Sequence, residues 1–237
     1  RPSRLQGAST VLLIQPMTST KQPPHRQLGF LDPYYVFTRC FVESDFAETH
    51  LRRIDMYEFP AVDLTDLPGL VVSSQVDQDY LYRHRDRIRS FLAAGGVVAF
   101  SGHLARQWLP GAGCFEPKSI ESHDDYTVVK ATPHPVFESV KMSDLTYQRG
   151  VAGFFARGHN PPPEHATTVL RLRDGEPVVY IDDESTAGTI FVHSGNDLIG
   201  FRRRDTTAER VPEQLVAWMR TVSTVRSTTT ATQGDRP

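Results

Sequence analysis

The sequence predicts an α/β fold in which a doubly wound, mostly parallel sheet lies between two layers of helices, a three-layer sandwich. Two observations lead to this prediction. Short continuous apolar runs, at 11–14, 70–72 and 97–100, are typical of strands buried on both faces of a parallel sheet. Segments with helical periodicity separate them, and the repeated strand–helix–strand order favours right-handed crossovers.

The size and charge of the chain exclude several classes of protein. Its 237 residues fit one large α/β domain, and the net charge of −2 gives no bulk attraction to nucleic acid or to an anionic membrane. No apolar run approaches the roughly 20 residues of a membrane-spanning helix. Cys40 and Cys114 are too far apart in the sequence for a metal-type pair. We expect a cytoplasmic, reduced protein without metal or cofactor, and a homo-oligomer is compatible with these features.

The N-terminal part of the chain is expected to supply two strands and a helix. Val11–Ile14 is the first predicted strand, followed by a polar loop over 17–28. Asp32 and Pro33 predict a helix start, because Asp is a good N-cap and Pro suits the first helical position. A second, short strand is predicted over 54–57.

A longer helix is predicted between the strand at 70–74 and the strand at 97–100. Asp77 and Asp79 lie at its start, where the helix dipole favours negative charge, and Gly95–Gly96 ends it. Four arginines alternate along this segment and are interpreted as a solvated face: Arg83, Arg85, Arg87 and Arg89.

Beyond residue 110 the pattern becomes richer in strands. Short apolar runs at 126–130, 167–170, 177–181 and 189–192 predict strands that extend the same sheet with antiparallel pairs. A closing helix is predicted over 206–222. Residues 1–222 then form a single domain. The Thr- and Ser-rich segment 223–237 has almost no apolar side chains and is expected to be a disordered tail.

Candidate site residues follow the predicted strands at their carboxyl ends, where open α/β sheets bind ligands. They are Ser73 and Ser74 after the strand at 70, Ser101, Gly102 and His103 after the strand at 97, and His193, Asn196 and Asp197 after the strand at 189. We expect these turns to converge on one crevice.

Two interpretations of these turns stay open. Ser101 and His103 can act as nucleophile and base, with His193 as the more plausible base and Asp197 as its partner. Alternatively, Ser101 only packs the turn, and Asn196 and Asp197 hydrogen-bond to their own backbone. The Gly-x-Ser-x-Gly elbow is absent around Ser101.

The segment 148–160 combines two arginines, two phenylalanines and several glycines. Arg149, Arg157 and His159 are candidate ligand-binding residues, because arginine can bind a carboxylate or phosphate with two hydrogen bonds. The segment is then a lid over the crevice. In the alternative interpretation it is a structural loop whose phenylalanines fill the core.

Four landmarks together resemble the ThuA-like branch of the class I glutamine amidotransferase-like superfamily. They are the opening apolar strand, the segment 91–103, the turn His134–Phe137 and the segment 188–197. The resemblance implies a flavodoxin-like sheet, but the chain differs from the superfamily at the positions that carry its catalytic residues. Glutamine amidotransferases carry a cysteine at the turn occupied here by Ser101–Gly102, and ThuA-like proteins often carry histidine where this chain has Asn196. We therefore expect no glutaminase activity.

The sequence supports three functional hypotheses. We favour a small-molecule binding or regulatory protein, whose ligand is a sugar or an anionic metabolite. The alternative is a hydrolase or sugar-modifying enzyme that uses Ser101 or His103 with His193 and Asp197. A third hypothesis is a protein-interaction module that uses the arginine-rich helix and the proline-rich loops.

Overall fold

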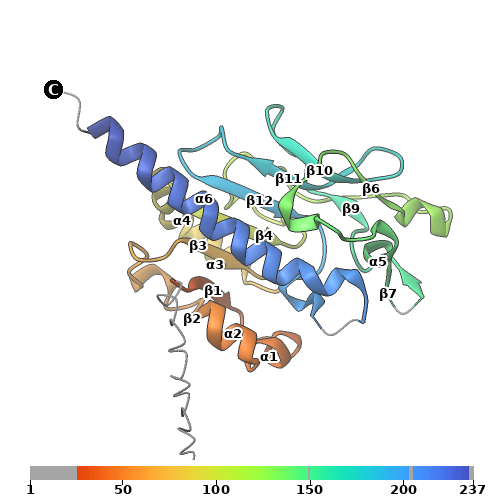
Figure 1. Cartoon of the computed structure of the whole chain (residues 1–237), viewed down its shortest axis with the longest axis horizontal. Helices are drawn as coiled ribbons and strands as arrows, with labels where there is room; N and C mark the ends of the chain where they lie inside the picture. The colour runs from red at the N-terminus through yellow and green to blue at the C-terminus, as the bar shows by residue number, and fades with distance from the viewer. Residues whose placement is uncertain (1–25, 149, 203–204, 235–237) are drawn as a thin grey trace, which may run out of the picture.

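The chain folds around one sheet of eight strands, which the computed structural model shows together with its flanking helices (Figure 1). The structure describes residues 26–148, 150–202 and 205–234. The strands of the main sheet are β1 (Leu28–Asp32), β2 (Leu51–Asp55), β3 (Gly69–Val72), β4 (Val97–Ser101), β6 (Val128–Lys130), β10 (Thr167–Leu172), β11 (Pro177–Asp182) and β12 (Thr189–His193). Two small pairs are β5 (Glu116–Pro117) with β9 (Gly158–His159), and β7 (Tyr147–Gln148) with β8 (Val151–Ala152).

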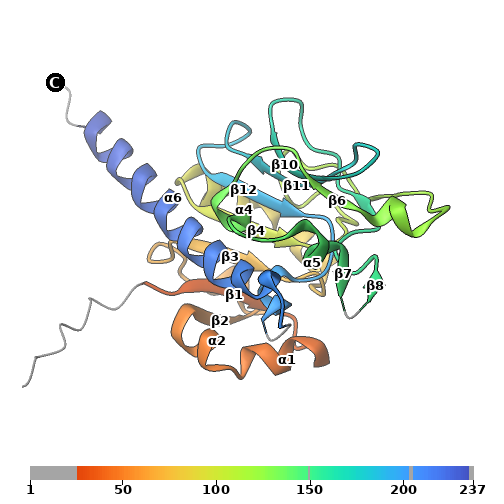
Figure 2. The same cartoon turned by 45° about the vertical axis from the view of Figure 1, so that its right-hand side comes forward.

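The strand order is β2-β1-β3-β4-β12-β11-β10-β6, from the lower part of Figure 2 to its upper part. The pairs from β2 to β12 are parallel, and those from β12 to β6 are antiparallel. The parallel part has the doubly wound order 2-1-3-4-5 of flavodoxin-like sheets, which changes direction between β1 and β3. This confirms the predicted fold class, including the antiparallel extension.

Helices cover both faces of the sheet and make it a three-layer sandwich. They are α1 (Val36–Val42), α2 (Asp45–His50), α3 (Gln78–Arg83), α4 (Arg85–Ala93), α5 (Met142–Thr146) and α6 (Val211–Gly234). Val97 and Ala99 of β4 belong to the core cluster that contains α2 and α6, whereas Val98 and Phe100 belong to the cluster that contains α3 and α4. This alternation follows from the two-residue period of a strand and produces one core on each face. In Figure 1, α6 lies in front of the sheet and α4 behind it.

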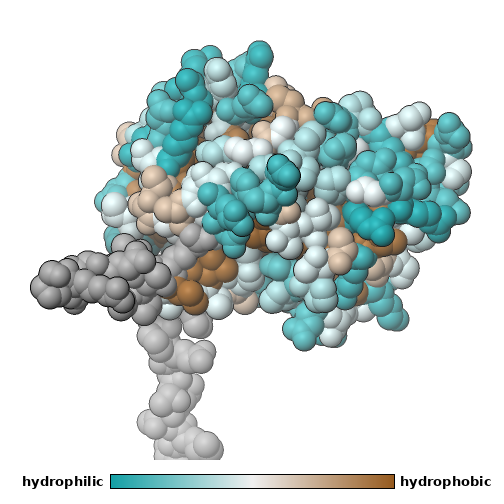
Figure 3. Space-filling model, turned by 90° about the horizontal axis from the view of Figure 1, so that it is seen from above, coloured by the Kyte–Doolittle hydropathy of each residue, from teal (hydrophilic) through white to brown (hydrophobic). Residues whose placement is uncertain are grey.

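The surface seen from above is mostly hydrophilic, and its hydrophobic areas are small and separated (Figure 3). Such scattered apolar residues are normal for a folded domain. Within the described residues, no helix combines the length and the apolar character that crossing a membrane requires.

The N-terminal prediction missed the first described strand and placed the helix start too early. β1 comes from Leu28–Asp32, at the end of the expected polar loop, and the predicted strand at 11–14 lies outside the described residues. Asp32 does not cap a helix: it ends β1, accepts a hydrogen bond from the Tyr34 amide at 2.8 Å, and pairs with Arg53 of β2. The helix itself starts later, at Val36. The residues Leu-Gly-Phe-Leu at 28–31 are apolar on both faces of the strand, as an inner strand requires. The sequence therefore carries the pattern of a buried strand at this position.

The other elements agree more closely with the sequence. β2, β3, β4 and the four later strands lie within a few residues of their predicted positions, and Asp77 caps α3 by accepting a hydrogen bond from Tyr80 N at 2.9 Å. The long helix predicted before β4 is divided at His84 into α3 and α4. Gly95 follows α4 with φ of +86°, as a left-handed helix end requires.

The C-terminal helix differs from the prediction in length. α6 runs from Val211 to Gly234, so residues 223–234 are helical where a disordered tail was expected. Threonine hydroxyls bond back to the helix, from Thr221 to Ala217 O at 3.0 Å and from Thr224 to Arg220 O at 2.9 Å. These local bonds satisfy the threonine hydroxyls within the helix, so a Thr-rich composition does not exclude helical structure.

Candidate functional site

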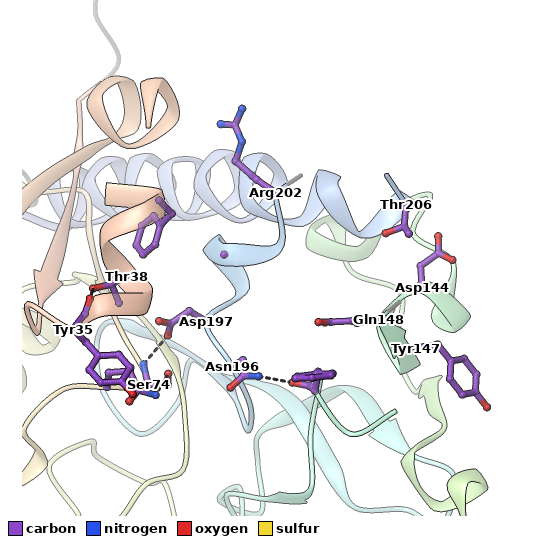
Figure 4. A pocket seen from close by; sticks show the side chains of 14 residues that line it. Tyr35, Thr38, Ser74, Asp144, Tyr147, Gln148, Asn196, Asp197, Arg202 and Thr206 are labelled. Carbon is purple, nitrogen blue, oxygen red and sulfur yellow. Dashed lines mark hydrogen bonds between the residues drawn. The ribbon is translucent and has the colours of Figure 1, made fainter. Parts of the chain in front are cut away.

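A pocket of about 720 Å³ lies where the sheet changes direction, at the carboxyl ends of β1, β3 and β12. This is the position at which doubly wound sheets bind ligands. Its lining residues come from α1 and the turn before it, the turns after β3 and β12, α5 and the β7–β8 pair: Tyr35, Thr38, Phe41, Ser74, Gln75, Asp144, Tyr147, Gln148, Phe154, Asn196, Asp197, Gly200, Arg202 and Thr206. Figure 4 shows Tyr35 and Ser74 at one end, Asn196 and Asp197 in the middle, and Gln148 and Tyr147 at the other end.

Asp197 joins the turns after β3 and β12 at the floor of this pocket. Its Oδ2 accepts a hydrogen bond from Ser73 Oγ at 2.7 Å, and its Oδ1 accepts one from the Ser74 amide at 2.6 Å (Figure 4). Burial raises the pKa of this carboxyl to about 6, because desolvation outweighs the hydrogen bonds that favour the charged form. The expected meeting of Ser73, Ser74 and Asp197 is thus present.

β4 is an inner strand with parallel neighbours on both sides, as predicted, but Ser101 is its last residue and only Gly102 begins the turn that follows. The Gly102 amide donates to His193 O at 2.9 Å, and φ of Gly102 is +148°. A Cβ atom there would lie 2.9 Å from Ser74 Cα, so the turn after β3 leaves room only for glycine.

The catalytic interpretation of Ser101 and His193 does not match their contacts. The two residues are register partners on β4 and β12, but Ser101 Oγ accepts a hydrogen bond from Leu198 N at 3.3 Å. His193 Nε2 lies 2.9 Å from Phe155 O, and complete burial lowers the pKa of the imidazole to about 3. His193 is therefore neutral and bonded to a carbonyl, while Asp197 is bonded to the turn after β3. Neither Ser101 nor His193 lines the pocket.

The catalytic candidate His103 and the predicted ligand-binding residues Arg157 and His159 lie outside the pocket lining. His103 stacks on Phe115 with ring centroids 3.6 Å apart, and its neighbour Arg157 donates from Nε to Gly153 O at 3.0 Å. His159 belongs to β9, and its Nε2 is 4.0 Å from Glu116 Oε2. Arg149 lies outside the described residues. The predicted lid is therefore not formed by Arg157 or His159.

The two phenylalanines of that segment divide between the two interpretations offered for it. Phe155 is buried and packs against His193 with ring centroids 4.4 Å apart, so it fills the core. Phe154 is 41% exposed and lines the pocket, and its carbonyl accepts a hydrogen bond from Asn196 Nδ2 at 3.2 Å. Asn196 and Phe154 thus form one continuous part of the pocket wall.

Asn160 holds the turn after β4, and the sequence analysis did not identify it. Its side chain is fully buried, accepts from Leu104 N at 2.9 Å and donates to Gly102 O at 2.8 Å. The backbone amide of Asn160 donates to Ser194 Oγ at 2.9 Å, so Asn160 joins the turns after β4 and β12. The pattern Asn-Pro-Pro-Pro gives no signal for this role, because the partners are 34 to 58 positions away.

Two further groups could only be found from the tertiary structure. Tyr35 and Thr38 enter the pocket from α1 and its N-cap, next to Tyr34, whose φ of +54° is unusual for a bulky residue. Tyr147 and Gln148 enter from β7 on the opposite side. Their positions depend on how α1 and the β7–β8 pair pack around the sheet edge, which local sequence does not specify.

A serine, a histidine and an aspartate also meet far from this pocket. His165 Nε2 lies 3.0 Å from both Asp182 Oδ1 and Ser185 Oγ. A catalytic relay needs the two ring nitrogens to contact different partners, so this cluster does not have that geometry. Among the described residues, no three His, Cys, Asp or Glu side chains are grouped to hold a metal ion.

Comparison with solved structures gives a distant structural likeness. No protein-family model matches the chain, and no curated protein matches it. The chain is similar to the structure of the cytoplasmic protein STM1381 from Salmonella typhimurium LT2, with 10% sequence identity and a TM-score of 0.45. The match covers 79% of this chain and 85% of the Salmonella chain.

Proposed function

We propose that this protein binds a small, uncharged, polyhydroxylated molecule of the sugar class in the pocket between α1 and β7. The observation that carries the proposal is the composition of this pocket, which places carboxylate and amide groups between aromatic rings. Its volume of about 720 Å³ lies within the range of pockets that enclose small ligands, roughly 300 to 1,000 Å³.

The polar groups of the pocket suit hydroxyl groups. Asn196 and Gln148 each carry a carbonyl oxygen and an amide group, and the oxygens of Asp197 accept hydrogen bonds. A sugar hydroxyl both donates and accepts, so it can satisfy either kind of group. Asp197 is also held in place by Ser73 and Ser74, which reduces the entropy lost on binding.

The aromatic groups suit the apolar faces of a sugar ring. Tyr35, Phe154 and Tyr147 are 39%, 41% and 42% exposed, so each leaves a large part of its ring accessible. In Figure 4, Tyr35 and Tyr147 lie on opposite sides of the pocket. C–H groups of a sugar ring can pack against such rings while the hydroxyls reach the amides and the carboxylate.

The charges favour a neutral ligand over an anionic one. The carboxylate of Asp197 lies on the pocket floor, and above its pKa of about 6 it repels an anion. The Arg202 guanidinium is held 3.4 Å from Glu213 and 4.5 Å above the Phe46 ring, and in Figure 4 it points away from Asp197. Of the two ligand classes expected from the sequence, the sugar therefore fits the described groups better.

Binding, rather than hydrolysis, is the proposed activity, because Ser101 and His193 are bonded to groups outside the pocket. A regulatory role through ligand binding is part of this proposal. The ThuA-like resemblance is also kept as a proposal. Its segment 91–103 includes the inner strand β4, and its segment 188–197 forms β12 and the turn that brings Asn196 and Asp197 to the pocket. A cytoplasmic location is also proposed, because Cys114 is a free, exposed thiol.

Isothermal titration calorimetry with a panel of neutral monosaccharides and disaccharides, and with the corresponding sugar phosphates, tests the proposal. We expect a neutral sugar to bind and its phosphate to bind more weakly at pH 7.5. Asp197→Asn should weaken binding roughly 10- to 100-fold, the equivalent of a lost hydrogen bond to a charged group. Arg157→Ala, an exposed residue outside the pocket, is the control and should leave the affinity unchanged. Equal loss in both variants, or binding of phosphates alone, would contradict the proposal.

A further inference from the structure

A second groove, of about 510 Å³, lies on another part of the molecule, where α4 faces two proline-containing loops. It is lined by Tyr82, Arg85, Arg89, Gln107, Leu109, Pro110, Gly111, Ala112, Gly113, Pro161 and Pro162. None of these residues lines the sugar pocket. The groove therefore brings together the arginine-rich helix and the proline-rich loops that the sequence offered as separate features.

The arginines of this helix do not all behave as a uniformly solvated face. Arg83 lies over the Tyr80 ring, and Arg87 donates to Val62 O at 2.5 Å. Arg85 and Arg89, one helical turn apart, instead line the groove. Arg85 and Arg89 therefore lie on the groove side of α4, whereas Arg83 and Arg87 contact other parts of the molecule.

Arg85 is held in position without a carboxylate. Its Nη1 donates to Tyr82 O at 2.7 Å, and its guanidinium lies 4.5 Å above the Tyr82 ring. Arg89 is paired at 3.1 Å with Asp86, but the two side chains are 53% and 82% exposed, and such surface pairs contribute little. Both guanidinium groups can therefore bind an incoming carboxylate at small cost. No Asp or Glu is among the described residues that line the groove.

The opposite wall is fixed by a backbone hydrogen bond between its two loops. The Gly113 amide donates to Pro161 O at 2.7 Å, which ties the two loops together. Pro110, Pro161 and Pro162 have no amide hydrogen, so the wall offers ring surfaces rather than backbone donors. Charge recognition in this groove must come from the arginines, and apolar contact from the partly exposed rings of Pro110, Pro161 and Pro162.

We propose that this groove docks an extended acidic segment of a partner protein, with carboxylates at alternate positions. Residues four apart on a helix are separated by about 6 Å along its axis. Alternate residues of an extended chain are separated by about 6.6 Å and point to the same side. A Glu-x-Glu segment therefore places one carboxylate at Arg85 and one at Arg89, each able to accept two parallel hydrogen bonds. Its backbone then runs along the proline wall.

Fluorescence polarisation with a labelled peptide tests this docking site. The probe is an eight-residue peptide of alternating Ser and Glu, and the reference peptide has Lys in place of Glu. We expect the acidic peptide to bind with at least tenfold lower affinity to the Arg85→Glu, Arg89→Glu double variant than to the unchanged protein. Arg83→Glu, outside the groove lining, makes the same charge change as either single variant, Arg85→Glu or Arg89→Glu, and should alter the affinity less than threefold, whereas each of those single variants should lower it more. Thermal unfolding of the unchanged protein and of each variant checks that the substitutions leave the fold intact.

Two comparisons make the result specific. A peptide with the same composition but with its glutamates in contiguous pairs, Glu-Glu-Ser-Ser repeated twice, should bind less tightly, because it has no two glutamates at alternate positions on the same side of an extended chain. An eight-nucleotide single strand of thymidines should bind more weakly than the alternating peptide. Equal loss of peptide binding in the Arg83 variant, equal affinity for the contiguous peptide, or tighter binding of the oligonucleotide would each overturn the proposal.

Discussion

Replacing Asn160 with alanine is expected to lower the free energy of unfolding by about 4 kcal/mol. The side chain is fully buried and makes two hydrogen bonds, from Leu104 N at 2.9 Å and to Gly102 O at 2.8 Å. Truncation leaves both backbone groups buried without a partner, at a cost of about 1 to 3 kcal/mol each. The sum of about 2 to 6 kcal/mol is a large part of the roughly 5 to 15 kcal/mol that stabilises a typical domain.

Urea denaturation followed by circular dichroism measures this loss. The midpoint should fall while the slope of unfolding free energy against urea stays constant, because the unfolded surface is unchanged. Asn196→Ala is the matched control: this exposed residue donates a single hydrogen bond to Phe154 O, and its loss should cost less than about 1 kcal/mol. A decrease below about 1 kcal/mol for Asn160→Ala, or equal decreases in the two variants, would refute the role of Asn160 in holding the turn after β4.

Three further outcomes are expected. The free energy of unfolding should fall by about 3 kcal/mol between pH 6 and pH 4. Burial lowers the pKa values of His193 and His134 to about 3 and about 4, so their protonation in the unfolded state favours unfolding as the pH falls. Burial raises the pKa of Asp197 to about 6, and this shift acts in the opposite direction. Asp197→Asn should therefore increase this loss to about 5 kcal/mol, measured by urea titrations at each pH. An unchanged dependence of unfolding free energy on pH would contradict the stabilising contribution assigned to Asp197 at low pH. Truncation after Val222 should change the melting temperature by less than about 2 °C, because the following Val225 is exposed; a drop of several degrees would show that the end of α6 packs on the domain. Ammonia release from glutamine should be absent, and activity lost on Cys114→Ser would disprove this expectation.

The sequence predicted the inner strands of the fold well because their signals are local. The run Val97–Phe100 is apolar on both faces and follows a Gly-Gly helix end, so its central position could be inferred without tertiary information. β1 was missed because Asp32-Pro33 has the residues of a helix start, while the carboxylate of Asp32 is used instead by Tyr34 N and Arg53. The prediction was wrong because Asp32, which has the character of an N-cap residue, ends a strand instead of capping a helix.

The position of the pocket could be predicted in part, since the rule for carboxyl ends of strands brings Ser74, Asn196 and Asp197 to the sheet edge where they line the pocket. It does not say which side chains at that edge face open space. Ser101 lies beneath the amide of Leu198, and His193 beneath the carbonyl of Phe155, so neither reaches the pocket. The two backbone groups that bond to Ser101 and His193 lie 97 and 38 positions away in the sequence, so only the tertiary structure identifies them.

The location of a bound sugar tests the central claim most directly. A crystal structure of the protein with the tightest-binding neutral sugar of the calorimetric panel should show the ligand between Tyr35 and Tyr147, with hydroxyl groups within 2.7–3.2 Å, the usual range, of Asp197 or Asn196. A sugar bound at another surface, or in the same pocket without a contact to either residue, would contradict the account.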